Sequence, residues 1–167
     1  MQAFADPTAV TTYGSRFVFA DLDQTTLSTS IRLDWTFTPN MSLQTYVRPF
    51  ISSGNFKNYK EFSRPEGFEF KIYGEEIGTI QKEDNIYTVD PDGNGVAGSL
   101  AFSERDFNFR SVQTNAVFRW EYRPGSALYL VWQQDRSAMI NRGDLRLQRD
   151  MNGLLDAKPT NVFLVKF

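Results

Sequence analysis

The sequence predicts an all-β protein, and more narrowly an antiparallel up-and-down transmembrane β-barrel. Apolar and polar residues alternate strictly over long stretches, which is the period of a strand with two different faces. These stretches are longer than most soluble strands, and each pair of them has a tight turn at one end and a long polar segment at the other. The 41% hydrophobic content is enough for a folded domain.

The first predicted strand pair begins at Leu27. From there to Phe37 the odd positions are apolar or Thr, while the even positions are all polar. Successive side chains of a strand point to opposite faces, so this segment has one apolar and one polar face. A turn follows at Thr38-Pro39-Asn40, and the alternation resumes from Met41 to Arg48. Two such runs around a Pro-Asn turn predict a β-hairpin.

A second hairpin of the same design is predicted at residues 111–132. Ser111 to Tyr122 alternates, a turn with Pro124-Gly125 follows, and the return strand is apolar at alternate positions and partly on its other side as well. When Pro39 is aligned with Pro124, Trp35 falls on Trp120. The sequence therefore repeats one structural unit, the hairpin, within a single chain.

The remaining segments are polar. We treat residues 1–167 as a single region with long polar loops at about 53–110 and 135–161, because no linker divides the chain. Within and after these loops we predict a small strand pair at 78–81 and 86–89, one short helical turn at 150–156, and a last strand at 162–167.

Strand length favours a membrane. The alternation from Thr25 to Phe37 is unbroken, whereas soluble strands usually have about 5–6 residues and tilted membrane strands need about 9–11. Aromatic residues precede both tight turns, as in the aromatic girdles of membrane barrels. The predicted lipid-facing residues are Leu27, Ile31, Leu33, Trp35, Phe37, Leu43, Val47, Phe118, Trp120, Tyr122, Leu128, Leu130 and Trp132. The predicted lumen-facing residues are Arg32, Asp34, Arg48, Arg119 and Glu121.

Two alternatives stay open. A soluble β-sandwich that binds glycans would show the same alternation, with its apolar face covered by a second sheet. The lumen-facing charges either line a permeation path or pair with one another and close the lumen. What covers the apolar face, lipid or protein, separates the first alternative from the membrane barrel.

Composition argues against catalysis in this region. The chain has no His and no Cys, which excludes Cys/His zinc sites and Ser-His or Cys-His catalysis. The carboxylate pairs Glu75-Glu76 and Glu83-Asp84 are adjacent in sequence and point apart in a strand. A glycoside hydrolase-associated domain is the enzymatic alternative. The net charge of −2 predicts no nucleic-acid partner.

One motif resembles part of a calcium loop. Asp90, Asp92 and Asn94 supply oxygen ligands at alternate positions, followed by Gly95. The twelfth position of such a loop is normally a bidentate Glu, and here it is Ala101. The alternative is an ordinary exposed turn rich in Pro and Gly. Calcium is the one cofactor that the sequence suggests.

Residues 16–40 closely resemble the C-terminal barrel region of DUF5916, a bacterial family of unknown function. Their sequence is RFVFADLDQTTLSTSIRLDWTFTPN. Further similar stretches, in the same order along the chain, are MSLQTYVRPFISSGNFKNYKEF, YTVDPDG, FNFRSV, NAVFRWEYRPGSALYLVWQQDRS and NVFLVK. Full-length members of the family typically carry an exported N-terminal carbohydrate-binding module of the family 9 type.

The resemblance implies the outer membrane of a Gram-negative bacterium and no catalytic mechanism. It implies that this chain is a C-terminal part of a larger barrel, because about eight strands are needed for closure and five or six long ones are expected here. The aromatic end at Phe167 suits either a last barrel strand or a truncation, and the resemblance favours truncation. The expected role is to anchor, or form a conduit for, the carbohydrate-binding module, with outer-membrane lipid, the rest of the barrel and a glycan as partners.

Overall fold

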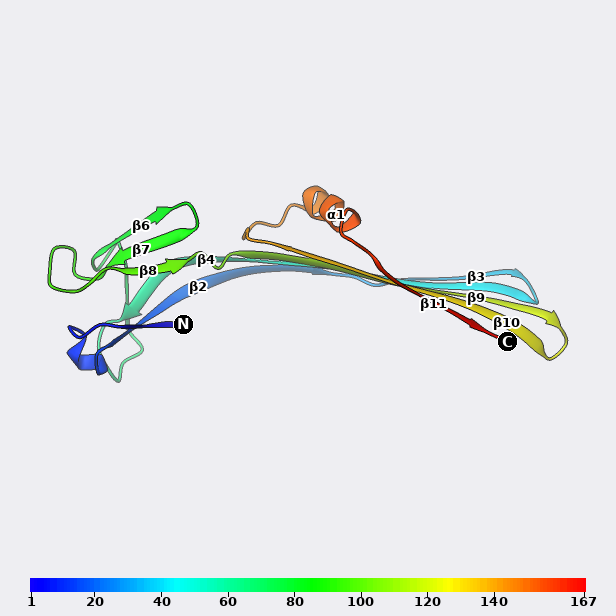
Figure 1. Ribbon diagram of the computed structural model, residues 1–167, viewed down its shortest axis with the longest axis horizontal. Helices are drawn as coiled ribbons and strands as arrows, with labels where there is room; N and C mark the ends of the chain where they lie inside the picture. Colours follow the sequence, from blue (N-terminus) through cyan, green and yellow to red (C-terminus); the bar gives the residue numbers. More distant parts are fainter. The chain divides into compact units, whose positions relative to one another are not determined.

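The computed structural model describes residues 1–167 and consists mostly of antiparallel β-strands with one α-helix (Figure 1). The predicted all-β class is confirmed. None of the helices has the length and apolar character needed to cross a membrane. The chain divides into two compact units. Unit 1 comprises Met1–Asp23 and Gly54–Asp106, and unit 2 comprises Gln24–Ser53 and Phe107–Phe167.

Unit 2 contains the predicted hairpins. Strand β3 pairs antiparallel with the first part of β4, and β10 pairs with both β9 and β11. Strand β4 in turn lies between β2 and β9 in the strand order. The bounds are Ser15–Ser28 for β2, Ile31–Thr38 for β3, Met41–Phe62 for β4, Phe107–Arg123 for β9, Ser126–Ile140 for β10 and Thr160–Lys166 for β11. The tight turns fall where the Pro-Asn and Pro-Gly pairs predict them.

The strand register of unit 2 places like residues side by side. Trp35 pairs with Leu43 across β3 and β4. On β10, Leu130 lies between Phe118 of β9 and Val165 of β11. Because paired residues of neighbouring strands project to the same side, the alternation within each strand becomes one apolar and one polar face of the sheet.

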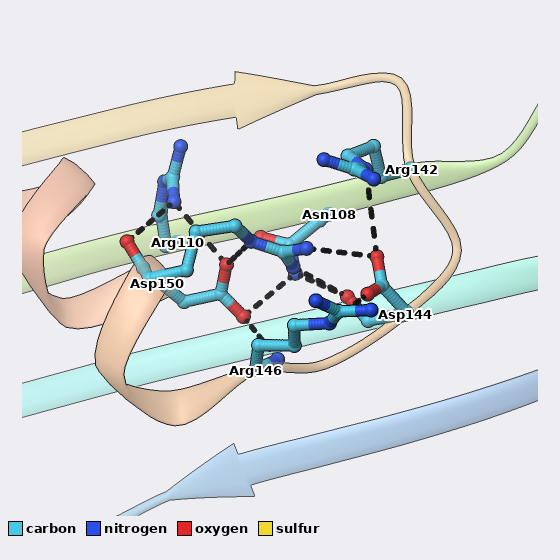
Figure 2. Close-up of polar contacts among 7 residues, drawn as sticks. Asn108, Arg110, Arg142, Asp144, Arg146 and Asp150 are labelled. Carbon is cyan, nitrogen blue, oxygen red and sulfur yellow. Dashed lines mark hydrogen bonds and ion pairs between the residues drawn. The ribbon is translucent and has the colours of Figure 1, made fainter.

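Helix α1, Leu147–Leu155, packs on unit 2 in the connection between β10 and β11. Its Asp150 is fully buried and accepts hydrogen bonds from Asn108 Nδ2 (3.0 Å), Arg110 Nη1 (3.3 Å) and Arg149 Nε (2.8 Å) (Figure 2). The single short turn predicted at 150–156 is therefore part of a longer helix. The connection itself is shorter than the sequence suggests, since β10 continues to Ile140.

Unit 1 contains several short strands, most of them within the segment 53–110 that is predicted to be a loop. β1 (Gln2–Ala5) pairs with β2, and β5 (Phe70–Ile72) pairs with the end of β4. A separate antiparallel sheet consists of β6 (Thr79–Glu83), β7 (Ile86–Asp90) and β8 (Leu100–Ser103). The predicted small hairpin is confirmed as β6 and β7. A 3-10 helix, η1 (Val10–Thr12), completes the unit.

A buried ion network lies beside the core of unit 1. Arg16 donates to Asp6 from Nε (2.5 Å) and to both carboxylate oxygens of Glu61 from Nη1 (2.9 Å each). The buried Tyr73 hydroxyl donates to Glu61 Oε2 at 2.7 Å. Burial and this hydrogen bond to a carboxylate raise the pKa of Tyr73, so its phenol stays a neutral donor. The hydrophobic core next to Tyr73 is formed by Val18, Val89, Leu100 and Phe102.

Replacing Glu61 with Gln is expected to destabilise unit 1 by about 3 kcal/mol, because the partly buried Arg16 then keeps only one of its two carboxylate partners, Asp6. Denaturant unfolding followed by hydrogen exchange at unit 1 amides measures this. The matched control is Glu69→Gln, whose ion pair with Arg64 is solvent-exposed on both sides and contributes little. Equal stabilities of the two variants would contradict a structural role for the Arg16 network.

Candidate functional site

The candidate site is the exposed apolar face of the unit 2 sheet, which we call the apolar face. It carries the predicted lipid-facing residues of β3, β4, β9 and β10, and none of the predicted set, including Leu27 of β2, is buried. Leu33 is 49% exposed, Trp35 56% and Trp120 42%. In a soluble sheet these side chains would be buried in the core. Because they are exposed, no layer of protein in unit 2 covers this surface.

The apolar face has a sharp upper edge across three strands. Asn161 of β11, Gln134 of β10 and Thr114 of β9 lie in one register row. Apolar residues lie on the turn side of this row, beginning with Trp132 and Phe163, whose rings stack 6.5 Å apart. The indole nitrogen of Trp132 donates to Asn161 Oδ1 at 2.9 Å. The ring of Trp132 therefore stacks on apolar Phe163, while its polar nitrogen is bonded to the polar row.

Beyond this row the same side of the sheet is mixed, because each cross-strand pair of β9 and β10 has one polar and one apolar member. Arg136 lies two residues further along β10, and Arg110 and Asn108 extend the series on β9. Helix α1 packs on these residues: Arg136 Nη1 donates to the carbonyl of Leu155, and Asn108 and Arg110 bind Asp150. The helix thus sits at the end of the apolar face that is opposite the tight turns.

The lower edge of the apolar face is aromatic. Trp35 stacks on Phe37 with ring centroids 5.5 Å apart, directly before the turn between β3 and β4. Trp120 and Tyr122 are 6.1 Å apart, directly before the turn between β9 and β10. Aromatic side chains therefore lie at both ends of the apolar face.

The opposite face carries the predicted lumen-facing charges. Arg119 and Glu121 form an ion pair at 2.6 Å. Arg32 and Asp34 line a hollow of about 390 Å³ together with polar residues of β4 and β9, namely Gln44, Thr45, Tyr46 and Asn115, and with Val117. This face is not uniformly polar, because Val117, Val131 and Leu164 form one apolar row across β9, β10 and β11. The sequence indicates this row, because the return strand of the second predicted hairpin is partly apolar on its other side as well.

The calcium-like motif forms a turn after β7. Asp90 Oδ1 accepts from the backbone N–H of Gly93 (3.0 Å), and Asp92 Oδ2 accepts from that of Ala97 (3.0 Å). The latter bond is the main reason that the pKa of Asp92 lies below its usual value. No group of three or more acidic side chains is arranged to hold a metal ion. Calcium binding through Asp90, Asp92 and Asn94 therefore stays a prediction.

Sequence reasoning missed the polar cluster at α1. Asn108 and Arg110 occupy alternate positions at the start of β9, which extends the alternation of that strand beyond its apolar part. This polar continuation is the only local signal, since the partner, Asp150, is 40 residues away. Hydrogen bonds from Arg149, the backbone of Arg146 and Asn108 outweigh burial and lower the pKa of Asp150, which keeps it ionised at neutral pH.

Changing Asp150 to Asn is expected to detach α1 from β9, because buried Arg110 then lacks its anionic partner, at a cost of about 3–5 kcal/mol. Hydrogen exchange at the amides of 147–155 should rise strongly, while exchange in β9 and β10 near their turn stays unchanged. The control is Asp144→Asn, because Asp144 is partly exposed and two of its three arginine partners, Arg142 and Arg146, are exposed. Unchanged protection of α1 in Asp150→Asn would contradict the anchoring role.

Comparison with known proteins gives one result. A family model described as "Domain of unknown function (DUF5916)" matches residues 2–167. No curated protein and no solved structure matches the chain. Because the family match extends over nearly all 167 residues, the chain belongs to the DUF5916 family.

Proposed function

We propose that unit 2 is a section of an outer-membrane β-barrel whose apolar face contacts lipid. The observation that carries this proposal is the exposure of one continuous aliphatic and aromatic surface in a sheet of otherwise paired strands. The soluble alternative, a β-sandwich, requires a second layer over Leu33, Trp35, Phe118 and Trp120, and none of these residues is buried. Lipid is the partner that such a surface suits.

The dimensions of the apolar face support the proposal. Eight residue steps separate Thr114, in the row at the upper edge, from Tyr122 in β9, which is about 27 Å of extended strand. A tilt of about 40° reduces this length to about 21 Å, slightly less than the apolar band of ~25 Å in outer-membrane barrels. The aromatic residues at the two ends of the face then lie at the two membrane interfaces, where amphipathic rings are favoured.

The edges of the sheet support the idea that further strands complete the barrel. All residues of β3 and β11 are exposed, and each of these two strands pairs with a single neighbour in unit 2. Open edges in lipid would leave backbone groups unsatisfied, so a spanning sheet must close. The rest of the barrel is supplied by polypeptide outside these residues. The barrel anchors an exported carbohydrate-binding module on that polypeptide, or forms a conduit for it.

An arginine at the middle of the apolar face tests lipid contact. In the full-length protein, Leu33→Arg or Phe118→Arg is expected to lower folding stability in lipid vesicles by about 2–4 kcal/mol, because a charge is placed in hydrocarbon. The control is Gln113→Arg, which puts the same side chain on the polar face of β9. Urea titrations in vesicles measure all three. A near-neutral Phe118→Arg would argue that protein or water, rather than lipid, contacts this face.

Cell fractionation of the full-length protein tests the location. The protein is expected in the detergent-extracted outer-membrane fraction, since its apolar face needs lipid. Retention in the soluble periplasmic or extracellular fraction after correct export would overturn the proposal.

A further inference from the structure

We infer that the hollow on the polar face of unit 2 binds small zwitterionic solutes of the α-amino acid type, and this inference rests on the proposed barrel, whose inner side is the polar face. We call this hollow the polar hollow. Its volume of about 390 Å³ lies within the range of about 300–1,000 Å³ that is typical of small-molecule sites. Its polar lining comes from three strands: Arg32 and Asp34 of β3, Gln44 and Tyr46 of β4, and Asn115 of β9.

The two charges of the polar hollow are not paired. Arg32 and Asp34 lie two positions apart in β3, and they pair across the ladder with Tyr46 and Gln44 of β4. The strand register therefore places all four residues on one side of the sheet. Neither Arg32 nor Asp34 forms an ion pair within the chain, so a cation and an anion lie side by side without a partner.

The second arginine–acid pair of the polar face differs in this respect. Arg119 and Glu121 are also two positions apart, in β9, and they form an ion pair at 2.6 Å. Glu121 Oε1 also accepts a hydrogen bond from the backbone N–H of Gly125 at 3.3 Å, in the tight turn between β9 and β10. Arg119 and Glu121 thus bond to each other and to the turn, whereas Arg32 and Asp34 line a hollow.

The unpaired charges suit a solute that carries both an anionic and a cationic group. The guanidinium of Arg32 matches the two oxygens of a carboxylate, and the carboxylate of Asp34 accepts hydrogen bonds from an ammonium group. Two positions of a strand are about 7 Å apart, so a solute whose ammonium and carboxylate groups are joined through one carbon can contact both residues at once. The amides of Gln44 and Asn115 add donors and acceptors around it.

Other small solutes fit this charge pattern less well. A singly charged solute pairs with one of the two residues and leaves the other charge without a partner. An uncharged sugar displaces water from both charges and neutralises neither. The polar hollow is therefore expected to prefer an amino acid to a carboxylic acid or a sugar of similar size.

The test uses the full-length protein in a deuterated detergent and measures solute binding by saturation-transfer NMR. The probes are L-alanine, L-lactate, in which a hydroxyl replaces the ammonium group, and uncharged glucose. Alanine is expected to bind more tightly than the other two. Arg32→Gln should weaken the binding of alanine roughly tenfold, and Asp34→Asn should do the same for alanine without weakening the binding of lactate.

The control is Arg119→Gln/Glu121→Gln, which changes the same types of charge on the same face outside the polar hollow and should bind alanine like the parent. Urea titration in vesicles verifies that all variants keep their fold. Alanine binding no tighter than that of lactate or glucose would overturn the inference, and so would parent-level alanine binding by both hollow variants.

Cell fractionation separates this inference from the proposed function. If the parent is found in the outer membrane and does not bind alanine, only the inference fails. If the parent is soluble and binds alanine with the expected dependence on Arg32 and Asp34, the proposed function fails and the binding site remains. A soluble parent that does not bind alanine contradicts both.

Discussion

The structure of unit 2 depends on one constraint: a sheet whose strands alternate between apolar and polar residues places most of its apolar side chains on one side. The backbone groups of its inner strands are satisfied by neighbouring strands, so the sheet needs no water along its middle. Its aliphatic and aromatic side chains are exposed and need a non-aqueous partner. A bilayer meets both conditions, since it accepts apolar side chains and tolerates only backbone that is fully hydrogen-bonded.

The position of helix α1 is consistent with the same constraint. The apolar face ends at the row of Thr114, Gln134 and Asn161, and from this row outward the strands carry Arg136, Arg110 and Asn108 on the same side. A helix held there by a buried carboxylate covers polar residues and leaves the apolar residues free. This arrangement differs from a soluble protein, in which a helix would cover the apolar part of the sheet.

Much of unit 2 could be predicted because its signals are local. Side-chain direction has a period of two, and Pro39-Asn40 and Pro124-Gly125 mark the turns, so the faces of β3, β4, β9 and β10 follow from the sequence. The anchoring of α1 could not be predicted, since Asp150 and Arg110 meet only through tertiary structure. The short strands β5 and β8 were missed for a similar reason: they have too few residues to show a period, and pairing with longer neighbours defines them.

All three tryptophans of the chain, Trp35, Trp120 and Trp132, lie on the apolar face, which makes intrinsic fluorescence a direct probe of what this face contacts. The measurement is fluorescence quenching by lipids brominated on their acyl chains, after the protein is folded into vesicles. Lipid contact predicts strong quenching. The quenching should be strongest for bromines on the acyl-chain carbons closest to the membrane interface. Fluorescence that is unaffected by brominated lipid, in protein shown to be folded, would contradict the account.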